Sequence, residues 1–257
     1  MLTPLSEDEP LALVSPREFY VLEGESPSWD EVTSIGPGER RSISVSIHIE
    51  ARARARMIRI FDVPEGSRLT LYHQVTLAEG ASWDNVIGIR GRGEVTIRRA
   101  VDVLGKDAQV RLVCLANMEK SSRISVSDEI FSQAAGTKND LRTKIVLKKQ
   151  ARSEVRGRVV INENSQHSTS YERLDHLVFG DQAMAVSIPE LEVKTDDVKC
   201  GHGATTSRPG EAEIFYLASR GLSVSVAEQL LARAFLAGAC VDLPQEVIDR
   251  ALDVVLG

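Results

Sequence analysis

Hydrophobic and polar residues alternate with a period of two along most of the chain. The pattern begins at Arg41, after which Ile43, Val45, Ile47 and Ile49 alternate with serine and histidine. Because successive side chains of a strand point to opposite faces, each alternating piece predicts a strand with one buried face. Similar pieces follow at residues 51–56, 68–72, 94–98, 109–113, 123–126, 143–147, 155–160 and 183–186, and no helical period interrupts them between about 41 and 200.

The segments between the strands predict how the strands are connected. Turn-forming residues separate the pieces, as in Pro64-Glu65-Gly66 and Gly105-Lys106-Asp107. Regularly spaced short strands are typical of a sandwich, a barrel or a solenoid. The hairpin dipeptides Asn-Gly and Asp-Gly are absent, and the small apolar residues suit the narrow interior of a solenoid. We therefore predict a parallel β-helix of roughly eight coils with ~20 residues each, with a sandwich as the alternative.

The period becomes helical after Ser207. A first helix over Glu211 to Arg220 should end at Gly221, which stands where a C′ glycine is expected. Ser223 or Ser225 caps a second helix, the latter as a capping box with Glu228, and a third helix begins near residues 242–244. All three are amphipathic, so we predict a small satellite bundle. Apolar surface left exposed on this bundle would be a site for partner docking, with packing back onto the solenoid as the alternative.

These patterns divide the chain into three parts. Residues 1–40 are rich in Pro, Glu and Ser and predict an extended N-terminal segment. Within it, the apolar pieces 11–14 and 19–22 are candidates for edge strands or docked surface segments. The predicted β-helix core covers 41–206, and the predicted C-terminal helical domain covers 207–257.

Charge and cysteine content narrow the class of protein. The balance of 31 basic against 37 acidic residues gives no long-range attraction to nucleic acid or to anionic lipid. The three cysteines, Cys114, Cys200 and Cys240, are widely spaced and form no CxxC, which favours a reducing compartment over a disulfide framework. The acidic N-terminus does not match a signal peptide, and no apolar run approaches the ~18 residues of a membrane span. We expect a soluble cytoplasmic protein that binds neither membrane nor nucleic acid.

The sequence offers one candidate for metal chemistry. It contains no P-loop, HExxH or GxSxG motif, so nucleotide hydrolysis and common hydrolytic chemistries are not expected. Cys200 and His202 stand one residue apart between glycines, and on an extended segment both side chains point to the same face. Thiolate and imidazole together suit iron or zinc, although a lone Cys-x-His pair is more often structural. His167 and His176 are second candidates for metal ligands, whereas Cys114 and Cys240 are interpreted as small buried hydrophobes.

A longer pattern surrounds the Cys-x-His pair. The segment PELEVKTDDVKCGHGATTSRPGEAEIFYLASRGLSVSVAEQLLARAF, residues 189–235, resembles the C-terminal signature of the SufB/SufD family of iron–sulfur cluster assembly proteins. The pattern residues are Pro189, Leu191, Glu192, Asp197, Val198, Cys200, His202 to Thr205, Phe215 to Leu217 and Ser219 to Gly221. The pieces ARSEVRGRVVI and SQHSTSYERLDHLVFGD extend the resemblance upstream.

The resemblance carries expectations about fold and partners. It implies a right-handed parallel β-helix followed by a helical domain that binds a SufC-type ATPase. It also implies pairing through the β-helix with a SufB-like chain or a second copy. The chain would then be no enzyme itself, because the partner supplies the ATPase.

The same resemblance implies where a cluster would be assembled. A nascent iron–sulfur cluster or iron would bind transiently at the subunit interface through His202 and Cys200, with none expected in the isolated protein. SufB-type chains have a cysteine where this chain has Leu174 and a glutamate where it has Gly203. The resemblance therefore implies that the chain is SufD-like and supplies half of a cluster site. A purely structural ATPase-docking subunit without metal ligands is the alternative. A β-solenoid enzyme acting on polysaccharide is disfavoured by the few aromatic residues.

Overall fold

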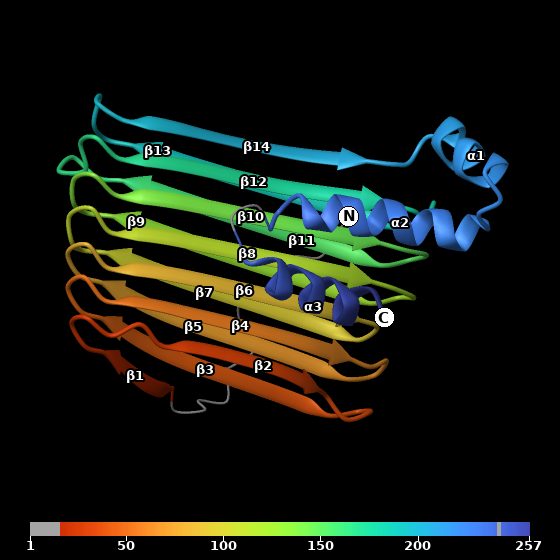
Figure 1. Cartoon of the computed structure of the whole chain (residues 1–257), viewed down its shortest axis with the longest axis horizontal. Helices are drawn as coiled ribbons and strands as arrows, with labels where there is room; N and C mark the ends of the chain where they lie inside the picture. Colours follow the sequence, from red (N-terminus) through yellow and green to blue (C-terminus); the bar gives the residue numbers. More distant parts are fainter. Residues whose placement is uncertain (1–15, 241–242) are drawn as a thin grey trace.

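The chain folds into a parallel β-solenoid followed in sequence by three helices, two of which lie over one of its sheets (Figure 1). The structure is a computed structural model that describes residues 16–240 and 243–257. The predicted β-helix followed by helices is confirmed. One sheet contains β1 (Arg17–Val21), β3 (Arg40–Ile49), β5 (Arg68–Leu77), β7 (Glu94–Val103), β9 (Arg123–Ser132), β11 (Arg152–Ile161) and β13 (Met184–Val193). The other contains β2 (Ser28–Ser34), β4 (Arg54–Val63), β6 (Ser82–Gly91), β8 (Gln109–Met118), β10 (Lys138–Leu147), β12 (Thr169–Val178) and β14 (Lys199–Ser207).

The coils are longer and fewer than predicted. Arg54 pairs with Ser82 and Ser82 with Gln109, so each coil is close to 28 residues long and the solenoid has about seven coils. Each coil carries two long strands, one in each sheet. The alternating pattern missed strands such as β6 and β12, because several consecutive residues in each are buried, which removes the alternation.

The corners between strands stack in columns. One column of successive corners has positive φ angles throughout: Arg52, Gly80, Asp107, Gly136 and His167. Backbone hydrogen bonds join one corner to the next, for example from Arg52 N to Glu79 O at 2.8 Å. The predicted strand over residues 51–56 is therefore wrong in its first half, because Arg52 forms a left-handed corner and β4 begins at Arg54.

The two sheets begin before residue 41, the predicted start of the β-helix core. β1 pairs with β3 and β2 pairs with β4, so residues 17–34 already form part of the solenoid. The apolar piece 19–22 contributes to β1 as an edge strand, while the piece 11–14 lies outside the described residues.

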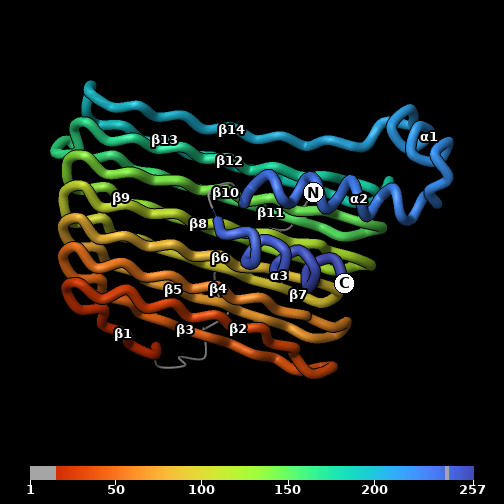
Figure 2. Tube along the Cα trace, viewed as in Figure 1, coloured from red at the N-terminus to blue at the C-terminus, as the bar shows by residue number. Residues whose placement is uncertain are grey.

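Two of the three helices pack back onto the solenoid. They are α1 (Glu211–Ser219), α2 (Val224–Ala237) and α3 (Gln245–Leu256). Buried side chains of α2 and α3, including Leu236, Leu252 and Val255, form one apolar cluster with the outer faces of β4, β6, β8 and β10. Figure 2 shows α2 and α3 lying over this sheet and α1 beyond its end. α2 contacts both α1 and α3, as predicted for a bundle, but the bundle is not a separate satellite, because α2 and α3 also pack onto the solenoid.

The ends of the first two helices test the predicted capping residues. Gly221 follows α1 with φ 86°, as expected for a C′ glycine. Ser223, not Ser225, caps α2, and its Oγ accepts a hydrogen bond from Val226 N at 3.3 Å. Within the described ranges, no helix is long and apolar enough to cross a membrane.

Candidate metal site at the C-terminal end of the solenoid

Cys200 and His202 lie on β14, the last strand of its sheet. β14 pairs with β12 along one edge, and its other edge has no strand beside it in the described part of the chain. Cys200 is in register with Ser170 and His202 with Glu172. The site is therefore at the open end of the solenoid, where the last coil has neighbours on one side only.

The two side chains point toward the interior face of β14. Ser170 and Glu172 on β12 are buried, and Cys200 packs against the interior apolar cluster. Because side chains alternate along a strand, His202 is on the same face as Cys200, as predicted. Cys200 is half-buried, whereas His202 is exposed because no further coil covers it.

The surroundings of Cys200 disfavour the thiolate form that a nucleophile needs. Burial raises its pKa above the ordinary value, and a hydrogen bond with the Ser170 backbone opposes this rise only in part. A bound metal ion would supply the positive charge that a thiolate needs at this position.

A third polar group at this end, Glu172, was not predicted from the sequence. Its side chain is 4% exposed, and neither carboxylate oxygen has a hydrogen-bond partner. Burial raises the pKa of Glu172 to about 8, with further increases from the charges of Asp128 and Glu190. The signal was present in the sequence, because Glu172 shares the strand parity of Leu174 and His176 and therefore faces inward with them.

Glu172 extends across the interior to the opposite sheet. A Cβ atom added at Gly157 on β11 would lie 1.7 Å from Glu172 Oε1, so the carboxyl group occupies the space that this glycine leaves. The neighbouring acid in register with Gly157 is Asp128, which is buried and bound by Arg99 through two contacts of 2.7 Å. Asp128 is thus neutralised by a cation, and Glu172 is not.

The two second-choice histidines are engaged with other groups. His176 is fully buried, and its ring nitrogens lie 2.9 Å from Ser153 Oγ and 3.1 Å from Ser187 Oγ. His167 forms a corner with φ 63°, and its Nδ1 lies 2.8 Å from a carboxylate oxygen of Asp197. In the described part of the chain, neither ring joins Cys200 and His202 in a group of three ligands.

The described residues do not form a complete ligand set. Among the residues that the structure describes, no three His, Cys, Asp or Glu side chains lie close enough together to hold a metal ion. Leu174, at the position of the SufB-type cysteine, is fully buried next to Ala204. A side chain at Gly203 would meet no atom within 4 Å.

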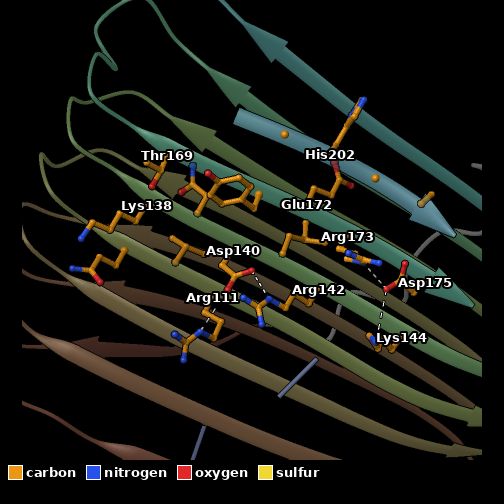
Figure 3. Close-up of a pocket in the computed structure, with 18 of the residues that line it drawn as sticks. Arg111, Lys138, Asp140, Arg142, Lys144, Thr169, Glu172, Arg173, Asp175 and His202 are labelled. Atoms are coloured by element: carbon orange, nitrogen blue, oxygen red, sulfur yellow. Dashed lines mark hydrogen bonds and ion pairs between the residues drawn. The ribbon is translucent and has the colours of Figure 1, made fainter. Parts of the chain in front are cut away.

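The outer face of the same strands borders a polar groove of about 930 Å³, whose lining also includes Glu172 and His202. Asp175 lies in it and accepts hydrogen bonds from Thr205 Oγ1 at 2.6 Å and from Arg173 Nε at 2.8 Å. Lys144 lies 3.8 Å from Asp175 and 4.5 Å from the ring centre of Phe235 on α2. Figure 3 shows the His202 side chain pointing away from these groups. These contacts join β14 and α2 to the solenoid beside the candidate metal site, which borders the same groove.

The features of this end of the solenoid agree with a known family. Residues 29–235 match the model of the SufBD core domain of the SUF system of FeS cluster assembly. The chain belongs to the SufBD family. Family membership supports a role in iron–sulfur cluster assembly.

Individual relatives are similar over part of their length. A SufBD family protein of Mycobacterium leprae is 28% identical over 168 residues, which cover 65% of this chain and 19% of the relative. The iron–sulfur cluster assembly protein SufD of Escherichia coli is 33% identical over 94 residues, 37% of this chain and 22% of SufD. The SufBD family protein ycf24 of Porphyra purpurea is 29% identical over 155 residues, 59% of this chain and 32% of the relative. The matched region thus spans between about a fifth and a third of these relatives.

Proposed function

We propose that this SufBD protein is a SufD-like, non-catalytic subunit of an iron–sulfur cluster assembly machine. In this role it contributes Cys200 and His202 to a cluster or iron site shared with a partner chain. The observation that carries the proposal is the position of this pair on β14, the last strand of its sheet, within a chain of the SufBD family.

The incomplete ligand set supports a shared site. Iron–sulfur clusters are commonly held by four protein ligands, most often thiolates with occasional histidine. Cys200 and His202 supply two, and the described residues contain no preformed group of three ligands. A SufB-like chain, or a second copy of this chain, would supply the others by placing strands beside the open edges of β13 and β14.

The exposed apolar side chains of α1 and α2 support docking of a SufC-type ATPase. Phe215 is 74% exposed and Tyr216 56%, and Val224 and Leu230 on α2 are exposed as well. α1 has no buried residue, so its apolar side chains do not stabilise the solenoid. A cluster of apolar residues of this kind is typical of a protein interface.

Anaerobic reconstitution with iron and sulfide tests the shared site. The chain, co-expressed with a SufB-like partner, should develop visible charge-transfer absorbance. Cys200→Ala combined with His202→Ala should lower the cluster yield severalfold while the partner still co-purifies. His48→Gln, a control on β3, should leave the yield unchanged because His48 lies in the second coil, bonded to Thr76 at 2.8 Å.

A purely structural subunit is the second candidate function. The half-burial and raised pKa of Cys200 favour it, because a packed thiol needs no metal. An unchanged cluster yield in the double variant, with both partners still bound, would establish this role and exclude the metal site.

Co-purification tests the ATPase surface separately. Phe215→Ser should reduce recovery of a co-expressed SufC-type ATPase at least severalfold without changing the unfolding temperature. Leu104→Ser removes a similarly exposed apolar side chain, 52% exposed, from a solenoid corner and should leave recovery unchanged. Equal loss in both variants would exclude the α1 surface as the docking site.

A further inference from the structure

We propose that Glu172 is a further metal ligand of this site, supplying a carboxylate oxygen beside His202 to a divalent first-row ion such as Fe²⁺. The inference rests on the proposed function in taking His202 as a ligand. It adds a donor that lies on a different strand from the Cys-x-His pair.

The register of the last coil places the two donors together. Glu172 and His202 are direct register partners on β12 and β14, and neighbouring strands of a sheet are ~4.8 Å apart. Both side chains are on the interior face, with Glu172 one layer below the open end. His202 is exposed, so its imidazole can rotate toward an ion without repacking the core.

The surroundings of Glu172 favour a cation. Its two oxygens have no hydrogen-bond partner, although the side chain is 4% exposed. The charges that act on it, from Asp128 and Glu190, are both negative. The cation on Asp128, Arg99, is already bound to that acid through two hydrogen bonds. A buried carboxyl group without a partner is costly, and a divalent ion bound to its oxygens would remove that cost.

The donor types match the metal class. Carboxylate oxygen, imidazole nitrogen and thiolate sulfur together suit Fe²⁺ or Zn²⁺ better than Mg²⁺ or Ca²⁺. The remaining coordination positions would be filled by water or by a partner chain, because the described residues contain no preformed group of three ligands. Gly157 is consistent with a metal-binding role for Glu172, since any larger residue at position 157 would displace the Glu172 carboxyl group.

Titration of the metal-free full chain with Co²⁺ under anaerobic conditions tests the inference. Wild type should develop visible d–d bands, and Glu172→Gln should raise the Co²⁺ dissociation constant at least about tenfold. Glu154→Gln, which changes a half-buried outward carboxylate on β11, should bind Co²⁺ as wild type does. Equal affinity of wild type and Glu172→Gln, or no Co²⁺ binding by wild type, would overturn the inference.

Two further measurements separate the inference from the proposed function and from a structural role. If His202→Ala loses Co²⁺ and Glu172→Gln does not, Glu172 is excluded while the metal role of His202 stands. If only Glu172→Gln loses Co²⁺ binding, Glu172 remains a metal ligand and His202 is excluded as one. A structural role would lower the unfolding temperature of metal-free Glu172→Gln. A ligand role would instead abolish the rise in unfolding temperature that Co²⁺ gives wild type.

Discussion

Polar residues inside the solenoid show how an inward position changes the chemistry of a side chain. His73 on β5 is 1% exposed, and burial together with the charges of Arg59 and Arg99 lowers its pKa to about 3. Arg99, in register with His73 on β7, keeps its charge because it is bound to Asp128. The interior therefore accepts an ion pair and a neutral histidine, but it opposes a second positive charge.

His73 should make the protein sensitive to acid. Its folded pKa lies below its unfolded value, so the unfolded state binds the extra proton, and stability falls as the pH drops below about 6.5. Between pH 7 and pH 5 this group alone should cost about 2 kcal/mol of the free energy of unfolding. Urea unfolding of wild type and His73→Leu at both pH values measures the difference. The variant should lose less stability than wild type, and an equal loss would contradict the prediction.

The strand corners are the elements that set the length of each coil. Gly105 stands at the corner between β7 and β8, where an added Cβ atom would lie 2.0 Å from the Glu79 backbone nitrogen of the preceding corner. Neighbouring corners stack through backbone hydrogen bonds, such as Gly80 N to Lys106 O at 2.8 Å. Close stacking therefore excludes a side chain at this position.

Gly105→Ala should destabilise the solenoid by about 1–3 kcal/mol, because the corner backbones must move apart. Gly203→Ala on β14 is the matched control, since its new methyl group meets open space. Urea unfolding at neutral pH compares the two. Similar midpoints for both variants would show that the corners are not closely stacked in solution.

At the scale of the whole molecule, the helices differ in packing: α3 packs on the solenoid and is called the fixed helix, whereas α1 buries no residue and is called the free helix. α3 packs on the middle of the solenoid, where Asn117 Nδ2 donates a hydrogen bond of 3.2 Å to Val255 O. α1 buries no residue and extends beyond the sheets, as Figure 1 shows. One helical region thus stabilises the fold and leaves another surface open for a partner.

Leu252→Ala on α3 should lower the free energy of unfolding by about 2–5 kcal/mol, because Leu252 is 2% exposed within the apolar cluster beneath the helix. The exposed Phe215→Ser substitution on α1 should have little effect in the same urea unfolding experiment. Equal effects of the two substitutions would contradict the division into a fixed and a free helix.

The sequence by itself determined the fold class, the change to helices after Ser207 and the Cys200–His202 candidate pair. Period-two alternation and helical periodicity are local properties of the chain, so they can be recognised without the tertiary structure. The family pattern around Cys200 likewise depends on residues close together in the sequence.

Tertiary structure alone decided the length of the coils, the docking of α2 and α3 and the surroundings of Glu172. The coil length could not be recognised from the sequence, because outward residues of strands such as β4 are apolar where the helices cover them, and this hides the alternation. Glu172 gains its importance from Gly157, His202 and Asp128, which are distant in the sequence and meet only through strand register and the crossing of the interior. Inward parity could have identified this acid as unusual, but the absence of a compensating cation is a property of the folded solenoid.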